Sequence, residues 1–307
     1  LAQILQRSFP GTKPFSPSSL EAYSKCAFRF FANNLMRLLP FEDNEATLLG
    51  KLVHKALFTV YNNKRESLNL PANSPLPALD KTIDRLLLEI ECRRLWQDAN
   101  EEFAGMIRIH RLNLLLVPNG VLDVLLEWLE TYEEKFGFIT GERDFSGTEI
   151  GFDTNGVPIL LAGRADRIDA DRTDPSNLAL VDFKTGKPNK DKVVAQTADG
   201  RLLQLPLYAI TTINELMQNQ KGELHVASAK YLHLADTESS SPNEIEVPLD
   251  EKSMEHAREI AIANADGIRR GKFSLSIHRN SKTPECMSYC SFGHACRQPA
   301  GLQRAFN

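Results

Sequence analysis

Three charged side chains near the middle of the chain have the types and the spacing of a metal-dependent hydrolytic site. Asp182 and Lys184 lie two residues apart at the end of an apolar run, residues 178–183, that is typical of a buried strand, so both side chains point to the same face. Asp166 lies on the preceding predicted strand, and a turn-rich linker centred near residue 174 joins the two. In a simple hairpin Asp166 then faces Asp182, with Cβ atoms about 4.5–5.5 Å apart. Two carboxylates this close repel each other unless a cation lies between them, and a hard divalent ion such as Mg²⁺ prefers these oxygen ligands.

Lys184 adds a positive charge beside this pair of carboxylates, where a phosphate or an attacking hydroxide would lie. The alternative interpretation is a surface ion pair on an edge strand, but the apolar neighbours favour a buried strand, in which unpaired charges are costly. The hairpin register is an assumption, because a slip of one residue would separate the two acids. Asp169 is the rival to Asp166, and its spacing of three residues places it on the other face of the strand.

Helices and strands at predictable positions must hold these side chains. A helix is expected to begin after Ser16 with Pro17 at its first position, and residues 18–21 have the spacing of a capping box. A second helix, over residues 48–62, has apolar residues at helical spacing and carries His54. Further apolar patterns predict strands over residues 157–169, 178–183, 224–234 and 244–249, and helices over residues 201–218 and 252–270.

Residues 78–137 form a strongly helical block without obvious chemistry. One apolar stripe at helical spacing comprises Leu79, Ile83, Leu86, Leu87, Ile90 and Leu95. A second stripe comprises Leu122, Leu125, Leu126, Leu129 and Tyr132. We interpret this block as an α-helical insertion that serves as a packing module.

The composition is that of an ordinary globular protein and excludes a wholly basic nucleic-acid binder. The 307 residues are 42% hydrophobic and 25% charged, and their net charge is −4. A local basic groove is compatible with this balance; two basic clusters are Lys184, Lys187, Lys190, Lys192 and Arg201, and then Arg269, Arg270 and Lys272. No apolar run approaches the ~20 residues that cross a bilayer, and the first residues lack a signal-peptide core, so we expect a cytoplasmic protein. The chain does not start with Met, which suggests a segment of a longer polypeptide.

The cysteines are few and unevenly placed. Cys286, Cys290 and Cys296 lie within one short stretch, and in an intracellular chain such crowding favours a metal site over a disulfide. A fourth ligand is needed for a tetrahedral zinc site or for an iron–sulfur cubane, and Cys26 in the first predicted helix is the candidate. Zinc bound with His294 in place of one cysteine is an alternative, and plain reduced cysteines are another.

Four short motifs in order resemble those of the PD-(D/E)XK nuclease superfamily, in its RecB-like branch. They are Gly-Lys-Leu-Val-His at residues 50–54, Gly-Arg-Ala-Asp-Arg-Ile-Asp at 163–169, Val-Asp-Phe-Lys-Thr-Gly at 181–186 and Gln-Leu-Pro-Leu-Tyr at 204–208. The resemblance implies an α/β fold of the restriction-endonuclease type, with a mixed sheet flanked by helices and the metal at the forked centre of the sheet. It also implies a single nuclease domain over residues 1–307, with residues 78–137 inserted in it.

The resemblance implies a role for each residue of the site. Asp166, Asp182, His54 and the backbone carbonyl of Phe183 correspond to the metal ligands, and Lys184 to the group that positions or activates the attacking water, so the catalytic residues are Asp166, Asp182 and Lys184. Gln204 and Tyr208 share one helix face, and they correspond to groups that contact the DNA or support the metal ligands. Spacing alone is equally compatible with Tyr208 packing beside its leucine neighbours.

The cysteines resemble those of AddB-type nuclease domains, in which one early and three late cysteines hold a 4Fe–4S cluster. By this resemblance the ligands are Cys26, Cys286, Cys290 and Cys296. This chain departs from the common pattern in two ways: three rather than two residues separate the first two late cysteines, and Ala27 stands where a proline often follows the first cysteine. Zn²⁺ at the same site stays the alternative.

Together these features predict hydrolysis of DNA phosphodiester bonds with Mg²⁺ or Mn²⁺. The resemblance places the chain in a helicase–nuclease system for DNA repair and recombination, with a helicase subunit as partner and single-stranded DNA or the ends of duplex DNA as substrate. The residues do not distinguish an exonuclease from an endonuclease, and the resemblance favours an exonuclease. The alternative is a non-catalytic DNA-binding or scaffolding domain of such a complex, stabilised by a metal cluster.

Overall fold

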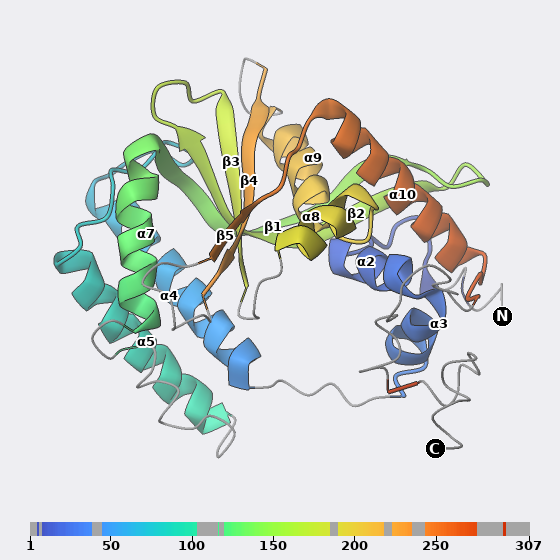
Figure 1. Ribbon diagram of the computed structural model, residues 1–307, viewed down its shortest axis with the longest axis horizontal. Coiled ribbons are helices and arrows are strands. Elements are labelled where there is room, and N and C mark those ends of the chain that lie inside the picture. The colour runs from blue at the N-terminus through green and yellow to red at the C-terminus, as the bar shows by residue number, and fades with distance from the viewer. Residues whose placement is uncertain are drawn as a thin grey trace.

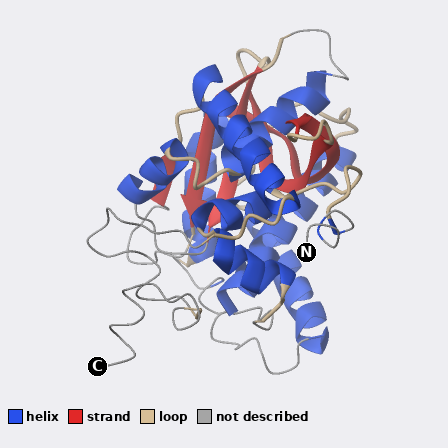
Figure 2. Cartoon of the chain, turned by 90° about the vertical axis from the view of Figure 1, so that its right-hand side faces the viewer, coloured by secondary structure: helices blue, strands red, loops and turns tan. Residues whose placement is uncertain are grey.

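The computed structural model has a five-stranded mixed sheet with helices on both faces (Figures 1 and 2). It describes residues 8–38, 45–102, 120–184, 190–217, 223–234 and 243–274, together with residues 5, 116, 291 and 292. The helices are α2 (Pro17–Lys25), α3 (Ala27–Phe30), the π-helix η1 (Phe31–Leu35), α4 (Glu45–Ser67), α5 (Ile83–Glu102), α7 (Val121–Lys135), α8 (Lys190–Ala198), α9 (Gln204–Met217) and α10 (Glu251–Arg269). The strands are β1 (Phe136–Phe152), β2 (Pro158–Asp171), β3 (Asn177–Lys184), β4 (His225–His233) and β5 (Asn243–Glu246).

The sheet order is β1-β2-β3-β4-β5, and only the β3–β4 pair is parallel among the pairs described. A parallel pair needs a crossover, and α8 and α9 lie between these two strands in the chain. In the β2–β3 hairpin, Arg167 pairs with Val181 and Ile168 with Leu180. This is the register that the sequence predicted, so the mixed α/β architecture and the hairpin register are both confirmed.

Two hydrophobic cores lie on opposite faces of the sheet. One contains residues of α2, α9 and α10, and the other contains residues of α4, α5 and α7. β3 contributes alternately to them: Leu180 belongs to the first core, and Val181 and Phe183 belong to the second. Because side chains alternate along a strand, Asp182 and Lys184 lie on the α9 side. Figure 1 shows the two groups of helices on opposite sides of the sheet.

A buried network of charged and phenolic groups holds α4 and α7 against β2. The guanidinium of Arg167 donates to Asp169 at 2.8–2.9 Å, to the Tyr61 hydroxyl at 2.6 Å and to Glu133 at 2.7 Å. The Tyr132 hydroxyl donates to Asp169 at 3.1 Å. Asp169 therefore has a structural role on the face that was predicted for it, away from Asp166. Tyr61 lies two turns after His54 on α4, so this network also fixes the helix that carries His54.

Two expectations about helix faces were wrong. The N-cap of α2 is Ser16, whose side chain accepts the Ser19 N–H, and Glu21 belongs to no capping box of its own helix. In α5 the predicted stripe Ile83, Leu86, Leu87 and Ile90 is exposed, whereas Leu88, Cys92, Leu95 and Trp96 are buried. Both sets have helical spacing, and the packing of α5 on α4 and α7 decides which of them is covered.

Two elements were missed, of which β1 matters more. The predicted change to strand periodicity began at residue 148, but β1 starts at Phe136. Its pairing with β2 shifts register three times, between Phe138 and Thr140, Ser146 and Thr148, and Glu149 and Gly151. Each bulge inserts a residue that breaks the period of two, so the alternating pattern is not visible in the sequence. The other missed element is α8. Among the helices that the structure describes, none has the length and apolar character to span a membrane.

Candidate active site

The site forms where β2 and β3 separate. The described ladder between them ends at Arg167 and Val181, and beyond it the backbone N–H of Phe183 donates to Asp166 Oδ2 at 2.9 Å. A side chain of β2 therefore takes the place of a backbone acceptor, and it is pinned to the neighbouring strand. This geometry matches the forked sheet that was expected to carry the metal.

Lys184 connects β3 to the first residue of α9. Its Nζ lies 2.6 Å from Asp182 Oδ2 and donates to Gln204 Oε1 at 2.9 Å. Burial lowers the pKa of Lys184, but the charge of Asp182 outweighs this effect and the pKa is raised overall. Lys184 is therefore a persistent cation, suited to holding an anionic group in place rather than to taking up a proton.

A metal-sized set of donors lies beside this pair, and it includes a residue that the sequence analysis missed. His54 Nδ1 lies 3.4 Å from Glu142 Oε1 and 3.6 Å from Asp166 Oδ1, and the three donor atoms lie within 4.8 Å of one another. An ion about 2.0–2.3 Å from each ligand atom requires separations of this size. His54 comes from α4 and its ring lies 5.2 Å from that of Phe183. Asp182 is not part of this set, because its carboxylate is drawn to Lys184.

Glu142 reaches the site from β1 with an unusual backbone. Its φ of 46° is in the left-handed region, which costs free energy for a residue with a Cβ and often marks functional positions. The carboxylate also contacts Arg164 at 3.2 Å. Burial raises the pKa of Glu142, but His54 and Arg164 lower it further, so the net shift is downward and Glu142 is an anion. The only local sequence signal is the short apolar run that precedes it on β1.

The electrostatics of the site favour a bound cation. Burial and the nearby charge of Asp182 raise the pKa of Asp166 to about 7. Burial lowers the pKa of His54, but the anions around it, Glu142 and Asp166 above all, raise it by more. Within the described part of the chain, Asp182 Oδ2 is buried and receives no hydrogen bond of acceptable geometry. A divalent cation fits this excess of negative charge, and carboxylates with one imidazole suit Mg²⁺ or Mn²⁺.

α9 places Gln204 and Tyr208 on the same side of the sheet as Lys184. Tyr208 is buried, and its ring packs edge-on against Phe145 with the centroids 5.5 Å apart. Burial raises the pKa of its hydroxyl, and the nearby Asp182 raises it further, so Tyr208 stays protonated and is a potential donor. The expected pairing of these two residues with the acidic cluster is therefore present in space.

Other expected groups lie elsewhere or outside the described residues. Cys26 is half-buried between α2 and α3, where its Sγ accepts the Arg29 N–H at 3.4 Å; Cys286, Cys290, Cys296, His294 and Lys187 are outside the described residues. Arg269 was expected in a basic surface patch, and this was wrong: it is buried and pairs with Asp153 at 2.9 Å. The carboxylate at the β1–β2 turn neutralises it, so it is not available to a phosphate.

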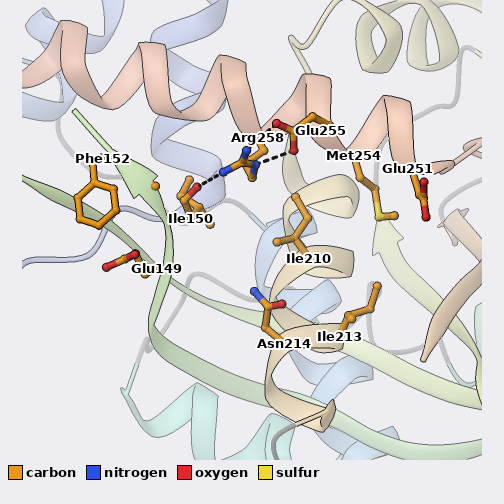
Figure 3. Close-up of a pocket in the computed structure, with 11 residues that line it drawn as sticks. Glu149, Ile150, Phe152, Ile210, Ile213, Asn214, Glu251, Met254, Glu255 and Arg258 are labelled. Atoms are coloured by element: carbon orange, nitrogen blue, oxygen red, sulfur yellow. Dashed lines mark hydrogen bonds and ion pairs between the residues drawn. The ribbon is translucent and has the colours of Figure 1, made fainter. Parts of the chain in front are cut away.

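A separate groove of about 560 Å³ lies between the end of β1, α9 and α10 (Figure 3). Ile150, Ile210, Ile213 and Met254 contribute apolar surface to it. Arg258 spans the gap from α10 and donates to the carbonyl of Ile150 at 2.8 Å. None of the candidate metal ligands lines this groove, so it is not part of the acidic site.

The sequence of residues 14–297 matches the PD-(D/E)XK nuclease superfamily. This chain belongs to that superfamily. An AddB-type ATP-dependent helicase/deoxyribonuclease subunit of Clostridium tetani is 24% identical over 247 residues, covering 75% of this chain and 20% of the relative. The corresponding protein from Symbiobacterium thermophilum is 28% identical over 255 residues, covering 77% and 20%. A shorter match, 28% identical over 156 residues, is to a 5′-nucleotidase of Vibrio vulnificus and covers 46% and 27%.

The chain spans about a fifth of the length of the helicase/deoxyribonuclease subunits that it matches. The similarity therefore concerns a domain-sized part of a longer relative. Within that length the family assignment agrees with the observed sheet, with the β2–β3 fork and with the acidic site beside it.

Proposed function

We propose that this chain is a deoxyribonuclease domain that hydrolyses DNA phosphodiester bonds with Mg²⁺ or Mn²⁺. The observation that carries the proposal is the meeting of His54, Asp166, Asp182 and Lys184 at the end of the β2–β3 hairpin. Superfamily membership and the names of the relatives support it. By analogy with them we infer an exonuclease in a cytoplasmic helicase–nuclease system for repair and recombination, acting on single-stranded DNA or duplex ends together with a helicase.

The ion would be held by His54, Asp166, Asp182 and the carbonyl of Phe183, and we add Glu142 to this set. When bound, a divalent ion lowers the pKa of water and neutralises charge that develops on the phosphate. Among the chain's own groups, Asp166 is oriented by the Phe183 N–H. The set of acids and the imidazole agree with the ligand chemistry of these ions.

Lys184 would hold a phosphate oxygen or the attacking hydroxide by charge. Its raised pKa keeps the ammonium protonated near neutral pH, and Gln204 orients it through the 2.9 Å hydrogen bond. A fixed cation aimed at the place where negative charge develops stabilises the transition state without reorganisation. Tyr208, buried and protonated beside the acids, is suited to donate to a phosphate oxygen or to a metal ligand.

We also propose that Cys26, Cys286, Cys290 and Cys296 hold a 4Fe–4S cluster. A clamp between residues 26 and 286 closes most of the chain into a ring and would stabilise the fold without transferring electrons. Visible absorption of anaerobically purified protein tests this, and Cys26→Ser should abolish it. A colourless protein that contains zinc would support the alternative, with His294 as a possible ligand.

We infer that residues 1–307 act as a single nuclease domain with residues 78–137 as an insertion. The buried network described above supports this, because Glu133 of the insertion contacts Arg167 of β2 at 2.7 Å. An insertion tied to the central sheet by a buried ion pair is expected to unfold together with it.

Cleavage of linear duplex and single-stranded DNA, with and without Mg²⁺ or Mn²⁺, tests the nuclease proposal. Asp182→Ala should reduce cleavage to background, because it removes an acid of the site. Asp144→Ala is the matched control, since Asp144 is an exposed acid of β1 that contacts only Arg164 among the described ion pairs. Metal-dependent cleavage by Asp182→Ala would refute the site assignment. Inactivity of the wild type under all of these conditions would favour the scaffolding alternative.

A further inference from the structure

Glu21 of α2 is a buried carboxylate that the proposed chemistry does not use. It is 6% exposed, and its Oε1 accepts the backbone N–H groups of Leu203 at 2.7 Å and of Gln204 at 2.9 Å. The acceptor and the donors are 182 and 183 residues apart in the chain. The capping-box spacing in the sequence correctly marked Glu21 as a capping group, but the helix that it caps is α9.

The N-terminus of α9 needs this acceptor. The first backbone N–H groups of a helix have no partner within the helix, and α9 begins at Gln204 after Leu203, whose side chain has no acceptor. Hydrogen bonds to a carboxylate are stronger than neutral ones, and a negative charge at a helix N-terminus is favoured by the helix dipole. Among the described ion pairs, the cation that contacts Glu21 is the half-exposed Lys25, at 3.4 Å, so the helix terminus is the closer partner of the carboxylate.

The capped residue is also the residue that holds the proposed catalytic lysine. Gln204 accepts from Lys184 Nζ at 2.9 Å, so Glu21 lies two contacts from the ammonium group. A second contact from α2 holds the preceding loop, because Ser24 Oγ donates to the carbonyl of Gly200 at 2.8 Å. Gly200 has a φ of 65°, and an added Cβ would lie 2.0 Å from Ile260, so this loop has little freedom to adjust.

We propose that Glu21 is a positioning residue that sets the first turn of α9 and thereby aims Gln204 and Lys184 at the reacting phosphate. The inference rests on the proposed nuclease function. It makes α2 part of the catalytic architecture and connects the segment next to Cys26 with the chemistry of β3. Loss of the cap would move Gln204, and displacements of about 1 Å at a reacting group cost up to about 100-fold in rate.

Steady-state kinetics of three variants at position 21 test the proposal, using the full chain and a linear DNA substrate with Mn²⁺. Glu21→Ala should lower kcat about 10–100-fold, with KM for DNA within about twofold, because Lys184 is misplaced but no DNA contact is removed. Glu21→Gln keeps an oxygen acceptor of the same length and should retain kcat within about fivefold. Glu21→Asp keeps the charge but withdraws the carboxylate by one methylene, and should lose kcat while its thermal stability stays close to that of the wild type.

Asn264→Ala is the matched control for a purely structural effect. Asn264 donates from α10 to the carbonyl of Leu20 at 3.3 Å, so the variant loosens α2 without touching α9. It should keep the wild-type kcat. An equal loss of kcat in Asn264→Ala and Glu21→Ala, or full kcat in a folded Glu21→Ala or Glu21→Asp, would overturn the proposal.

Hydrogen exchange at the amides of residues 203 and 204 provides a readout that does not depend on activity. Protection should fall in Glu21→Ala and persist in Glu21→Gln, and unchanged protection in Glu21→Ala would contradict the capping role. An inactive wild type refutes the proposed nuclease function, whereas an active wild type with kinetically unaffected position-21 variants refutes only this inference.

Discussion

Replacement of Asp166 by Asn should change how the stability of the metal-free protein depends on pH. In the wild type, burial and the neighbouring Asp182 raise the pKa of Asp166 from an ordinary value near 4 to about 7. Between these values the native protein keeps a proton that the unfolded chain has released. The free energy of unfolding therefore falls as the pH rises through this window and levels off above it.

The size of the effect follows from the shift. One pKa unit corresponds to about 1.4 kcal/mol, so a shift to about 7 implies a loss on the order of 4 kcal/mol between pH 4 and pH 8. Because His54 lies 3.6 Å from Asp166 and shares the proton, about 2–4 kcal/mol is a reasonable range. At about 2 °C for each kcal/mol in a chain of this size, Tm should fall by roughly 4–8 °C.

Asp166→Asn isolates this contribution. An Asn side chain can still accept the Phe183 N–H that Asp166 accepts at 2.9 Å, but it carries no titratable proton. The variant and the wild type should have similar Tm values at pH 5, and the variant should be the more stable protein at pH 8. Both proteins share every other titration, so the difference between their curves reports on this position.

Differential scanning calorimetry in EDTA across pH 5–8 measures the effect. Adding Mn²⁺ at pH 8 should raise the Tm of the wild type and leave that of Asp166→Asn nearly unchanged, because the ion offsets the charge that the variant lacks. Parallel stability curves for the two proteins over the whole range would refute the reasoning, since they would mean that the Asp166 carboxyl titrates as it does in the unfolded chain.

Three further predictions concern the same region. Glu142→Gln should weaken Mn²⁺ binding on the order of 10–100-fold in isothermal titration calorimetry, whereas Asp144→Asn, at the exposed acid nearby, should leave it within about twofold; equal affinities would exclude Glu142 as a ligand. Arg167→Ala should lower the free energy of unfolding by about 3–5 kcal/mol, because it leaves two carboxylates buried without a counter-charge, and denaturant titration at pH 7 checks this value. Gly141→Ala should reduce both Tm and cleavage, because the new Cβ would lie 2.7 Å from the backbone carbonyl oxygen of Asp166; unchanged values would show that the β1–β2 pair adjusts freely there.

The alternation of side chains along β2 and β3 made much of the site predictable. Apolar residues at a period of two and a compact turn determine a hairpin register locally. The observed pairing of Arg167 with Val181 continues to the expected placement of Asp166 and Asp182 at the fork. His54 and Gln204 were located by motif order, and the structure brings them to the same place.

Glu142 was not predictable because its strand hides its period. Three register shifts in β1 break the alternation, and a glutamate between charged neighbours reads as a solvated loop residue. The face of α5 was mispredicted for a related reason. Two apolar stripes with equally good helical spacing compete in that helix, and only contact with α4 and α7 selects one of them.

The sequence by itself determined the chemistry of the ligands, the β2–β3 register and the position of a capping carboxylate in α2, because each depends on residues close together in the chain. The tertiary structure decided that Glu142 joins His54 and Asp166 and that Glu21 caps α9 rather than its own helix. Such contacts link segments far apart in the chain, and local spacing carries no information about them. They follow from how two layers of helices pack on the sheet and from the requirement that buried charges find partners there.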